Sequence, residues 1–140
     1  MSLEIESDFK IKKDKILYKV MRKIDDDTYQ SEMGRDTYEA LFGGDKYKKG
    51  KTYKKKYFDR VSYEKAPSVY YSAGFHCYNK LQDAFDTLTC VNLVVVKVRI
   101  GKILAKGLEG GREVVVTDSI KILEEVNEKN EELETNINGI

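Results

Sequence analysis

The only histidine of the chain, His76, stands directly before Cys77, which is one of two cysteines. An imidazole beside a thiolate is the pairing used by cysteine nucleophiles, and both residue types also bind zinc. Adjacent residues of a strand point to opposite faces, however, so the two side chains are expected to diverge. Zinc takes about four ligands, and the sequence offers no second histidine and no CxxC pair. Packing in the core is therefore favoured over catalysis, and no metal site is predicted.

A second candidate is Glu113, which stands at the start of a run of valines. An ionised carboxylate at this point must face water or point into a pocket, because carboxylates are rarely buried without a partner. A strand-end charge facing water is the favoured interpretation. The alternative is a catalytic or ligand-binding carboxylate.

The third candidate is the run from Lys46 to Tyr57, in which lysines alternate with tyrosines. Lysines neutralise phosphates and tyrosines stack on unpaired bases, so the run could bind nucleic acid. The candidate contacts are Lys48, Lys49, Lys51, Tyr53 and Lys55. The formal net charge of the whole chain is only +1, whereas nucleic-acid-binding domains usually carry a domain-wide basic patch. A solvated loop or an edge hairpin blunted with lysine is therefore favoured.

The elements around these residues are predicted from periodicity. A short helix follows His76, with Asn79 as N-cap and Gln82 placed to reach back to the amide of the cap. Its buried face has the spacing i, i+3, i+4 and i+7, carried by Leu81, Ala84, Phe85 and Leu88. These signals predict a helix over about residues 79–88.

Strands are predicted on both sides of this helix. Alternation over 15–23 predicts a strand with one face largely buried, followed by an aspartate turn and a return strand at 28–31. Residues 92–100, 102–106 and 112–117 are rich in branched side chains and are separated by short glycine turns. That pattern predicts a three-stranded antiparallel meander.

The C-terminal segment holds two patterns. Ile120 and Ile122 alternate with polar residues and continue as a strand to about Leu123. A charged helix is predicted after it, over about 124–135. Its heptad spacing hints at a homo-oligomer and is carried by Leu123, Val126, Asn130, Leu133 and Ile137.

The predicted fold class is therefore α+β, with a mostly antiparallel twisted sheet, one short helix and a C-terminal helix. Residues 1–14 are expected to form a polar arm, 15–126 a single domain, and 127–140 a charged helix or tail. No apolar run approaches the ~20 residues of a membrane span, and no signal peptide is visible. Cys77 and Cys90 are expected to be free thiols of a cytoplasmic protein.

Four segments carry a resemblance to a known family, namely Gly50–Tyr53, Gly74–Ala84, Val94–Ile103 and Glu113–Ile122. Together they resemble small phage and prophage proteins that share a GFH-C-N-L-DA segment and a closing T/S-x-I-K-I strand. The resemblance covers about residues 50–126. It implies a phage or mobile-element origin and no established activity.

A more distant similarity is to the ADP-ribosyltransferase fold. Gly74-Phe75-His76 before Ala84 is similar to the family's GFY strand and helix, and Glu113–Ile120 is similar to its late EYVVxDxxQI strand. The resemblance implies that Glu113 is catalytic and polarises a ribose hydroxyl of NAD. Leu17–Met21 stands where the family has LYHGT, but the histidine and the glycine are missing, and no Ser-Thr-Ser strand is evident. The NAD chemistry is therefore in doubt.

Two main functions follow as hypotheses. The first is a non-enzymatic, phage-associated binding module for a partner or a nucleotide-like ligand, with no cofactor. The second is an ADP-ribosyltransferase-like enzyme or degenerate relative, with NAD bound in a cleft lined by Tyr18, His76 and Glu113 and with Tyr18 stacked on nicotinamide. Nucleic-acid binding through the Lys/Tyr run is the lesser alternative.

Overall fold

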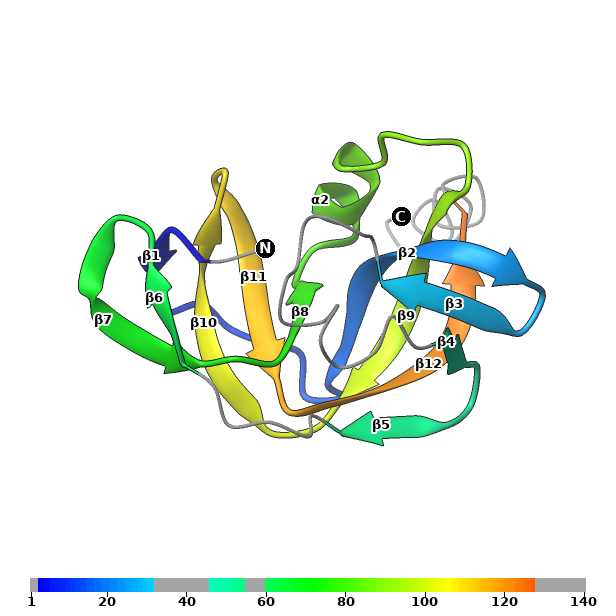
Figure 1. Ribbon diagram of the computed structural model, residues 1–140, viewed down its shortest axis with the longest axis horizontal. Coiled ribbons are helices and arrows are strands. Elements are labelled where there is room, and N and C mark those ends of the chain that lie inside the picture. Colours follow the sequence, from blue (N-terminus) through cyan, green and yellow to red (C-terminus); the bar gives the residue numbers. More distant parts are fainter. Residues whose placement is uncertain (1–2, 32–45, 55–59, 128–140) are drawn as a thin grey trace, which may run out of the picture.

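The computed structural model describes residues 3–31, 46–54 and 60–127 of the 140-residue chain. Within these residues the chain forms a ten-stranded sheet and a separate two-stranded sheet, and every strand pairing is antiparallel (Figure 1). The long path of the large sheet has the order β1-β10-β11-β8-β2-β9-β12-β5, and β3 and β4 branch from β2.

The strands before the helix are β1 (Ile5–Glu6), β2 (Ile16–Asp25), β3 (Thr28–Ser31), β4 (Lys46–Lys48), β5 (Thr52–Lys54), β6 (Arg60–Tyr63), β7 (Ala66–Ser72) and β8 (Phe75–Tyr78). The helix α2 (Leu81–Asp86) follows, and then β9 (Leu93–Ile100), β10 (Ile103–Glu109), β11 (Arg112–Thr117) and β12 (Ser119–Val126). The described chain is mostly antiparallel sheet with one short helix, so its class is mainly β and not the predicted α+β.

The helix lies where it was predicted, but its start differs. The N-cap position is Lys80, and no side chain caps the helix there. The amide of Asn79 is instead turned to other partners, described below, and Gln82 donates to Asp86 Oδ1 at 2.8 Å. Tertiary contacts therefore replace the predicted capping box. The apolar face of α2 packs as expected, with Ala84 buried in the core.

The predicted meander is wrong at its first turn. β10 pairs with β11, but β9 pairs with β2 and β12. The chain crosses at Gly101, where a Cβ would collide with the side chains of Asp118 and Ser119. Backbone bonds continue through this crossing, from Gly101 N to Ser119 O at 3.1 Å and from Asp118 N to Lys102 O at 3.0 Å. The segments β9–β10 and β11–β12 thus form one long ribbon that bends at Gly101.

β8 and β2 lie between the two halves of the bent ribbon. Both faces of the resulting sheet bury apolar side chains. One face buries Tyr18, Tyr78, Val114 and Val116 beneath α2 and the β6–β7 hairpin. The other buries Leu17, Met21, Cys77 and Val115. The strand predicted to have one buried face, β2, is consequently buried on both sides over residues 17–21.

The predicted C-terminal helix is contradicted where the structure describes it. Residues 124–126 belong to β12, whose last residue, Val126, lies opposite Val95 and is buried. Val126 therefore does not serve as a core position of the predicted heptad helix. The remainder of the predicted helix, 128–135, and the other heptad positions Asn130, Leu133 and Ile137 lie outside the described residues.

The N-terminal arm, described from Leu3, is docked onto the sheet. Leu3 is fully buried, and Ile5 and Glu6 pair with Leu108 and Gly107 of β10. Phe9 then packs against the second core face. Within the described residues, no helix is long and apolar enough to cross a membrane.

Candidate anion-binding groove

Tyr18 and His76 lie on the same face of the sheet. Tyr18 stands directly opposite Tyr78, and Tyr78 is two residues from His76 on β8. Both candidates are buried, at 6% and 3% exposure. Tyr18 Oη accepts a hydrogen bond from Lys12 Nζ at 2.8 Å, and His76 Nε2 lies 3.4 Å from Tyr71 Oη. These contacts make Tyr18 and His76 parts of the packed interior.

Glu113 lies on the opposite face from these two residues. It directly precedes Val114, which stands opposite Tyr78 in the β11–β8 pairing, and successive residues of a strand alternate between faces. The structure therefore does not bring Tyr18, His76 and Glu113 together around one cleft.

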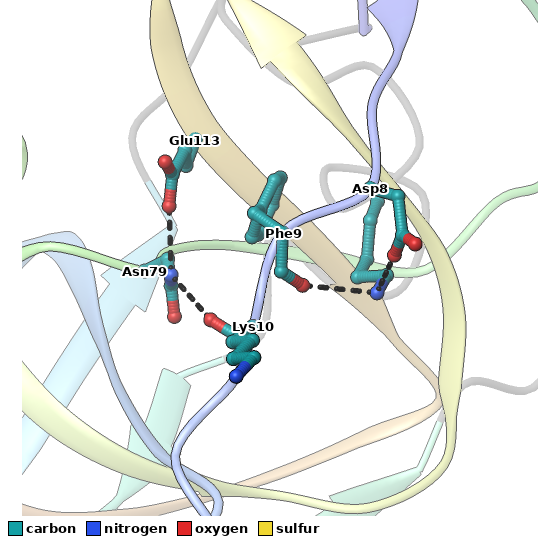
Figure 2. A network of polar contacts seen from close by, with 6 residues as sticks. Asp8, Phe9, Lys10, Asn79 and Glu113 are labelled. Carbon is teal, nitrogen blue, oxygen red and sulfur yellow. Dashed lines mark hydrogen bonds and ion pairs between the residues drawn. The ribbon is translucent and has the colours of Figure 1, made fainter.

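Glu113 is instead part of a polar network that fastens the N-terminal arm (Figure 2). Asn79 Nδ2 donates to Glu113 Oε1 at 2.8 Å and to the carbonyl of Lys10 at 3.1 Å. Lys80 Nζ lies 3.5 Å from Glu113 Oε2. The carboxylate of Glu113 and the amide of Asn79 thus join β11, the end of β8, the start of the helix and the N-terminal arm. This arrangement stabilises the fold.

A buried lysine, Lys19, is a feature that the pattern analysis missed. It is 4% exposed, and its Nζ donates to the carbonyl of His76 at 2.8 Å. The sequence did hold a signal for this burial. Lys19 stands between Leu17 and Met21 in the alternation of β2, so it shares a face with these two buried apolar residues. Cys77 is buried on that same face, whereas Cys90 is exposed, and both are free thiols.

The Lys/Tyr run is explained by the period of a strand. On β4, Tyr47 is buried between the exposed Lys46 and Lys48, and on β5 the half-buried Tyr53 lies between exposed residues. The tyrosines therefore face the core and the lysines face water. β4 and β5 are edge strands that pair with β3 and β12 respectively, not with each other.

The turn between β4 and β5 is held to two distant parts of the sheet. Lys49 N donates to Asp27 O in the β2–β3 turn, and Gly50 N donates to Ile122 O on β12, both at 2.8 Å. Gly50 has a φ of +84°, a conformation that other L-residues rarely adopt. These bonds fix the backbone from which the lysines of the turn extend.

Tyr53 adds a further contact to this turn. Its hydroxyl accepts a hydrogen bond from Lys48 N at 2.8 Å, and Lys51 Nζ lies 5.5 Å from the ring centroid. Its ring also meets Tyr47 edge-on, with the centroids 4.8 Å apart. Tyr53 is therefore engaged in structure and is not presented as a platform for bases.

A groove of about 540 Å³ lies beside this turn, lined by Asp27, Lys48, Lys49, Gly50, Lys121, Ile122 and Leu123. Its described lining residues thus include three lysines and one aspartate. The hydrogen bond from Asp27 N to Asp25 Oδ1, at 3.0 Å, is the main cause that lowers the pKa of Asp25, and it braces the turn that carries Asp27. The arrangement can hold an anionic group.

Of the predicted nucleic-acid contacts, the structure brings Lys48 and Lys49 to this groove and places Lys51 in the β4–β5 turn, whereas Tyr53 lies on β5. Lys55 lies outside the described residues. Lys121 was missed, because it comes from β12, far along the chain, and only the tertiary structure adds it. No group of three or more His, Cys, Asp or Glu side chains that could hold a metal ion is found in the described ranges.

Comparisons of the chain with protein-family models, with curated proteins and with solved structures found no match. The function must therefore be argued from the residues of the site.

Proposed function

We propose that this protein is a small non-enzymatic binding module and that its ligand presents an anionic group to the groove beside Gly50. The observation that carries the proposal is the convergence of Lys48, Lys49 and Lys121 on one groove, where Asp27 is the one acidic residue among the described lining residues. Charge alone attracts anions weakly in water, but several cations around a concave surface focus the field.

The rigidity of the turn supports binding over a merely solvated surface. The backbone bonds to Asp27 and Ile122 hold Lys49 and Gly50 in place, and Tyr53 holds Lys48. A ligand meeting a preformed site loses less affinity to the ordering of the protein.

The arrangement around Glu113 favours binding over catalysis. The carboxylate already accepts a hydrogen bond from Asn79, and Tyr18 and His76 lie on the other face of the sheet. The enzyme alternative is tested by incubation with labelled NAD beside a Glu113→Gln control, and turnover that the control abolishes would restore it. Association with a phage belongs to the proposal and rests on the resemblance of residues 50–126.

The proposal is tested by titrating the protein with tripolyphosphate at constant ionic strength and following backbone amides by NMR. We expect the largest shifts at residues 48–51 and 121–123, which surround the groove. The double variant Lys48→Gln/Lys121→Gln should lose the saturable part of this response, because two of its three cations are gone.

Lys65→Gln serves as the control for charge removed away from the groove, because Lys65 lies in the β6–β7 turn, at the opposite end of the molecule from the β4–β5 turn (Figure 1). It should titrate like the wild type. Equal responses from the double variant and the wild type, or shifts spread over the whole surface, would contradict an anion site at the groove.

A further inference from the structure

A row of basic residues crosses the sheet beside the groove. In the strand register, Lys121 of β12 stands directly between Arg99 of β9 and Thr52 of β5. Lys54 shares its face with Thr52, two residues further along β5. Arg99, Thr52 and Lys54 are exposed, and Lys121 is half-buried. Three cations thus lie on neighbouring strands of one face.

Like charges placed directly opposite each other on neighbouring strands destabilise a sheet. Arg99 and Lys121 form such a pair, with Cβ atoms expected about 4.5–5.5 Å apart. The nearby carboxylate of Glu124 lies 3.5 Å from Lys97, and Asp118 accepts the amide of Lys102. Among the described carboxylates, none forms an ion pair with Arg99 or Lys121, so an external anion would relieve this repulsion.

Lys121 belongs to both the row and the groove, which makes the two continuous. The basic path, defined as Lys48, Lys49, Lys121, Arg99 and Lys54, therefore extends from the groove across three strands. Neighbouring strands are about 4.8 Å apart, so the part of the path from β5 to β9 alone spans roughly 10 Å. That length exceeds what one phosphate group can contact and fits an extended chain of phosphates.

We propose that the basic path binds the phosphodiester backbone of nucleic acid, with one phosphate in the groove and its neighbours along the row. This inference rests on the proposed function and names its ligand class. Because Tyr53 is held by Lys48, Lys51 and Tyr47, the described residues of the path present cations and no stacking platform. The protein therefore contacts phosphates and not base faces, in contrast to the base stacking expected from the Lys/Tyr run.

The test uses fluorescence anisotropy with a labelled twelve-residue thymidine strand, its abasic counterpart and a duplex of the same length. Contact with three phosphates gives a salt slope of about −2 for a single strand, so affinity should fall roughly twentyfold between 50 and 200 mM salt. The abasic strand should bind within about twofold of the thymidine strand, because the loss of one stacking contact would weaken binding about fivefold or more. Comparing the affinities for the single strand and the duplex shows whether single-stranded or double-stranded nucleic acid supplies the phosphodiester backbone.

Arg99→Gln provides the decisive variant. Losing one phosphate contact should reduce the slope by about 0.7 and weaken strand binding about fivefold at 0.1 M salt. Tripolyphosphate should still shift the amides of residues 48–51 in this variant, because Lys48 and Lys49 remain at the groove, and Lys65→Gln should match the wild type in both measurements.

The outcomes separate the two proposals. If tripolyphosphate binds at the groove but Arg99→Gln binds the strand like the wild type, the nucleic-acid inference fails and the anion-binding function stands. If neither probe binds, both fail. If the abasic strand binds at least tenfold more weakly than the thymidine strand, contact through the backbone alone is overturned.

Discussion

Two polar regions of this protein look alike in composition and differ in how their charges are satisfied. Around Asn79, the carboxylate of Glu113 has an amide donor and a lysine within reach, and the docked arm supplies a carbonyl (Figure 2). Around Gly50, the hydrogen bonds satisfy the backbone, whereas the three lysines of the groove meet one aspartate. The first region uses its side chains to hold the fold, and the second is where we propose that a ligand meets the lysines.

The contrast is instructive because the residue types of the first region suggest chemistry more readily than those of the second. The segment around His76 and Asn79 carries the motif-like residues, yet its side chains are absorbed by packing and by the network. The segment around Gly50 resembles a solvated loop, yet its backbone is anchored at both sides. How well a polar group is satisfied is therefore a better guide to its role than the residue types alone.

The largest effect is expected from Asn79→Ala. The variant removes the donor to Glu113 and to the carbonyl of Lys10, and a hydrogen bond to a charged group contributes about 1.5–3 kcal/mol. We expect a loss of about 1–3 kcal/mol in the free energy of unfolding by urea, with tripolyphosphate binding intact. Gln82→Ala, which loses only an exposed bond to Asp86, is the control and should change stability by less than about 0.5 kcal/mol. An Asn79→Ala protein as stable as this control would show that the network is dispensable.

Gly50→Ala should have a smaller effect on stability and should also affect binding. A Cβ there meets nothing within 4 Å, so the cost is the left-handed backbone, about 1–2 kcal/mol. Gly111→Ala is a matched control, because its φ of +77° and open surroundings repeat those of Gly50 in a turn of β10–β11. Urea unfolding should give similar losses for both variants, whereas only Gly50→Ala should weaken tripolyphosphate binding. If both variants bind tripolyphosphate equally well, the β4–β5 turn is not part of the anion-binding site.

Acid should loosen the arm before the rest of the sheet. The Gly110 amide and Lys65 lower the pKa of the Glu4 carboxyl, and Lys106 lowers the pKa of the Asp8 carboxyl. The stabilisation is fully present above the ordinary values of 4.5 and 3.8, and it is lost as the pH falls through the lower folded values.

Hydrogen exchange between pH 5 and pH 2 measures this effect at the amides of Glu4 and Ser7, which bond to β10. Their protection should fall relative to that of β9 amides, after correction for intrinsic rates. A constant ratio would mean that the two carboxylates do not hold the arm.

The smallest effect on stability is expected at the groove itself. Lys48→Gln should leave the free energy of unfolding within about 0.5 kcal/mol of the wild type, since it breaks no ion pair with a described carboxylate. Lys106→Gln is the comparison from the arm, where the ammonium donates to Asp8 at 2.6 Å and to the carbonyl of Phe9 at 3.0 Å. It should cost about 0.5–1.5 kcal/mol in urea unfolding. A larger loss from Lys48→Gln would identify it as a structural lysine.

Much of the local structure follows from side-chain periodicity. The alternation in Ile16–Met21, the branched residues of Leu93–Ile100 and the spacing from Leu81 to Phe85 predicted a strand, a strand and a helix, and the structure has them. The alternation of lysine and tyrosine predicted a solvated loop or an edge hairpin, whereas the structure has two edge strands, β4 and β5, that keep their lysines in water but do not pair with each other. Each of these features depends on neighbours a few residues away, which a sequence displays directly.

Side-chain periodicity could not predict which strands pair with each other. Several valine-rich strands are equivalent by pattern, and the bend at Gly101, set by its contact with Asp118 and Ser119, decides that β9 pairs with β2 and not with β10. In the same way Asn79 satisfies all the local requirements of an N-cap, but Glu113, 34 residues away, takes its side chain.

By itself, then, the sequence determined that the segments around β2, β9 and β11 are extended, that a short helix follows His76, and where the lysines of β4 and β5 gather. Only the tertiary structure decided that Lys121 joins Lys48 and Lys49 at one groove while Glu113 is separated from Tyr18 and His76. The physical reason is that periodicity encodes the orientation of a side chain within its own strand. The distance between two charges on different strands depends on register and sheet order, which are set by packing over the whole molecule.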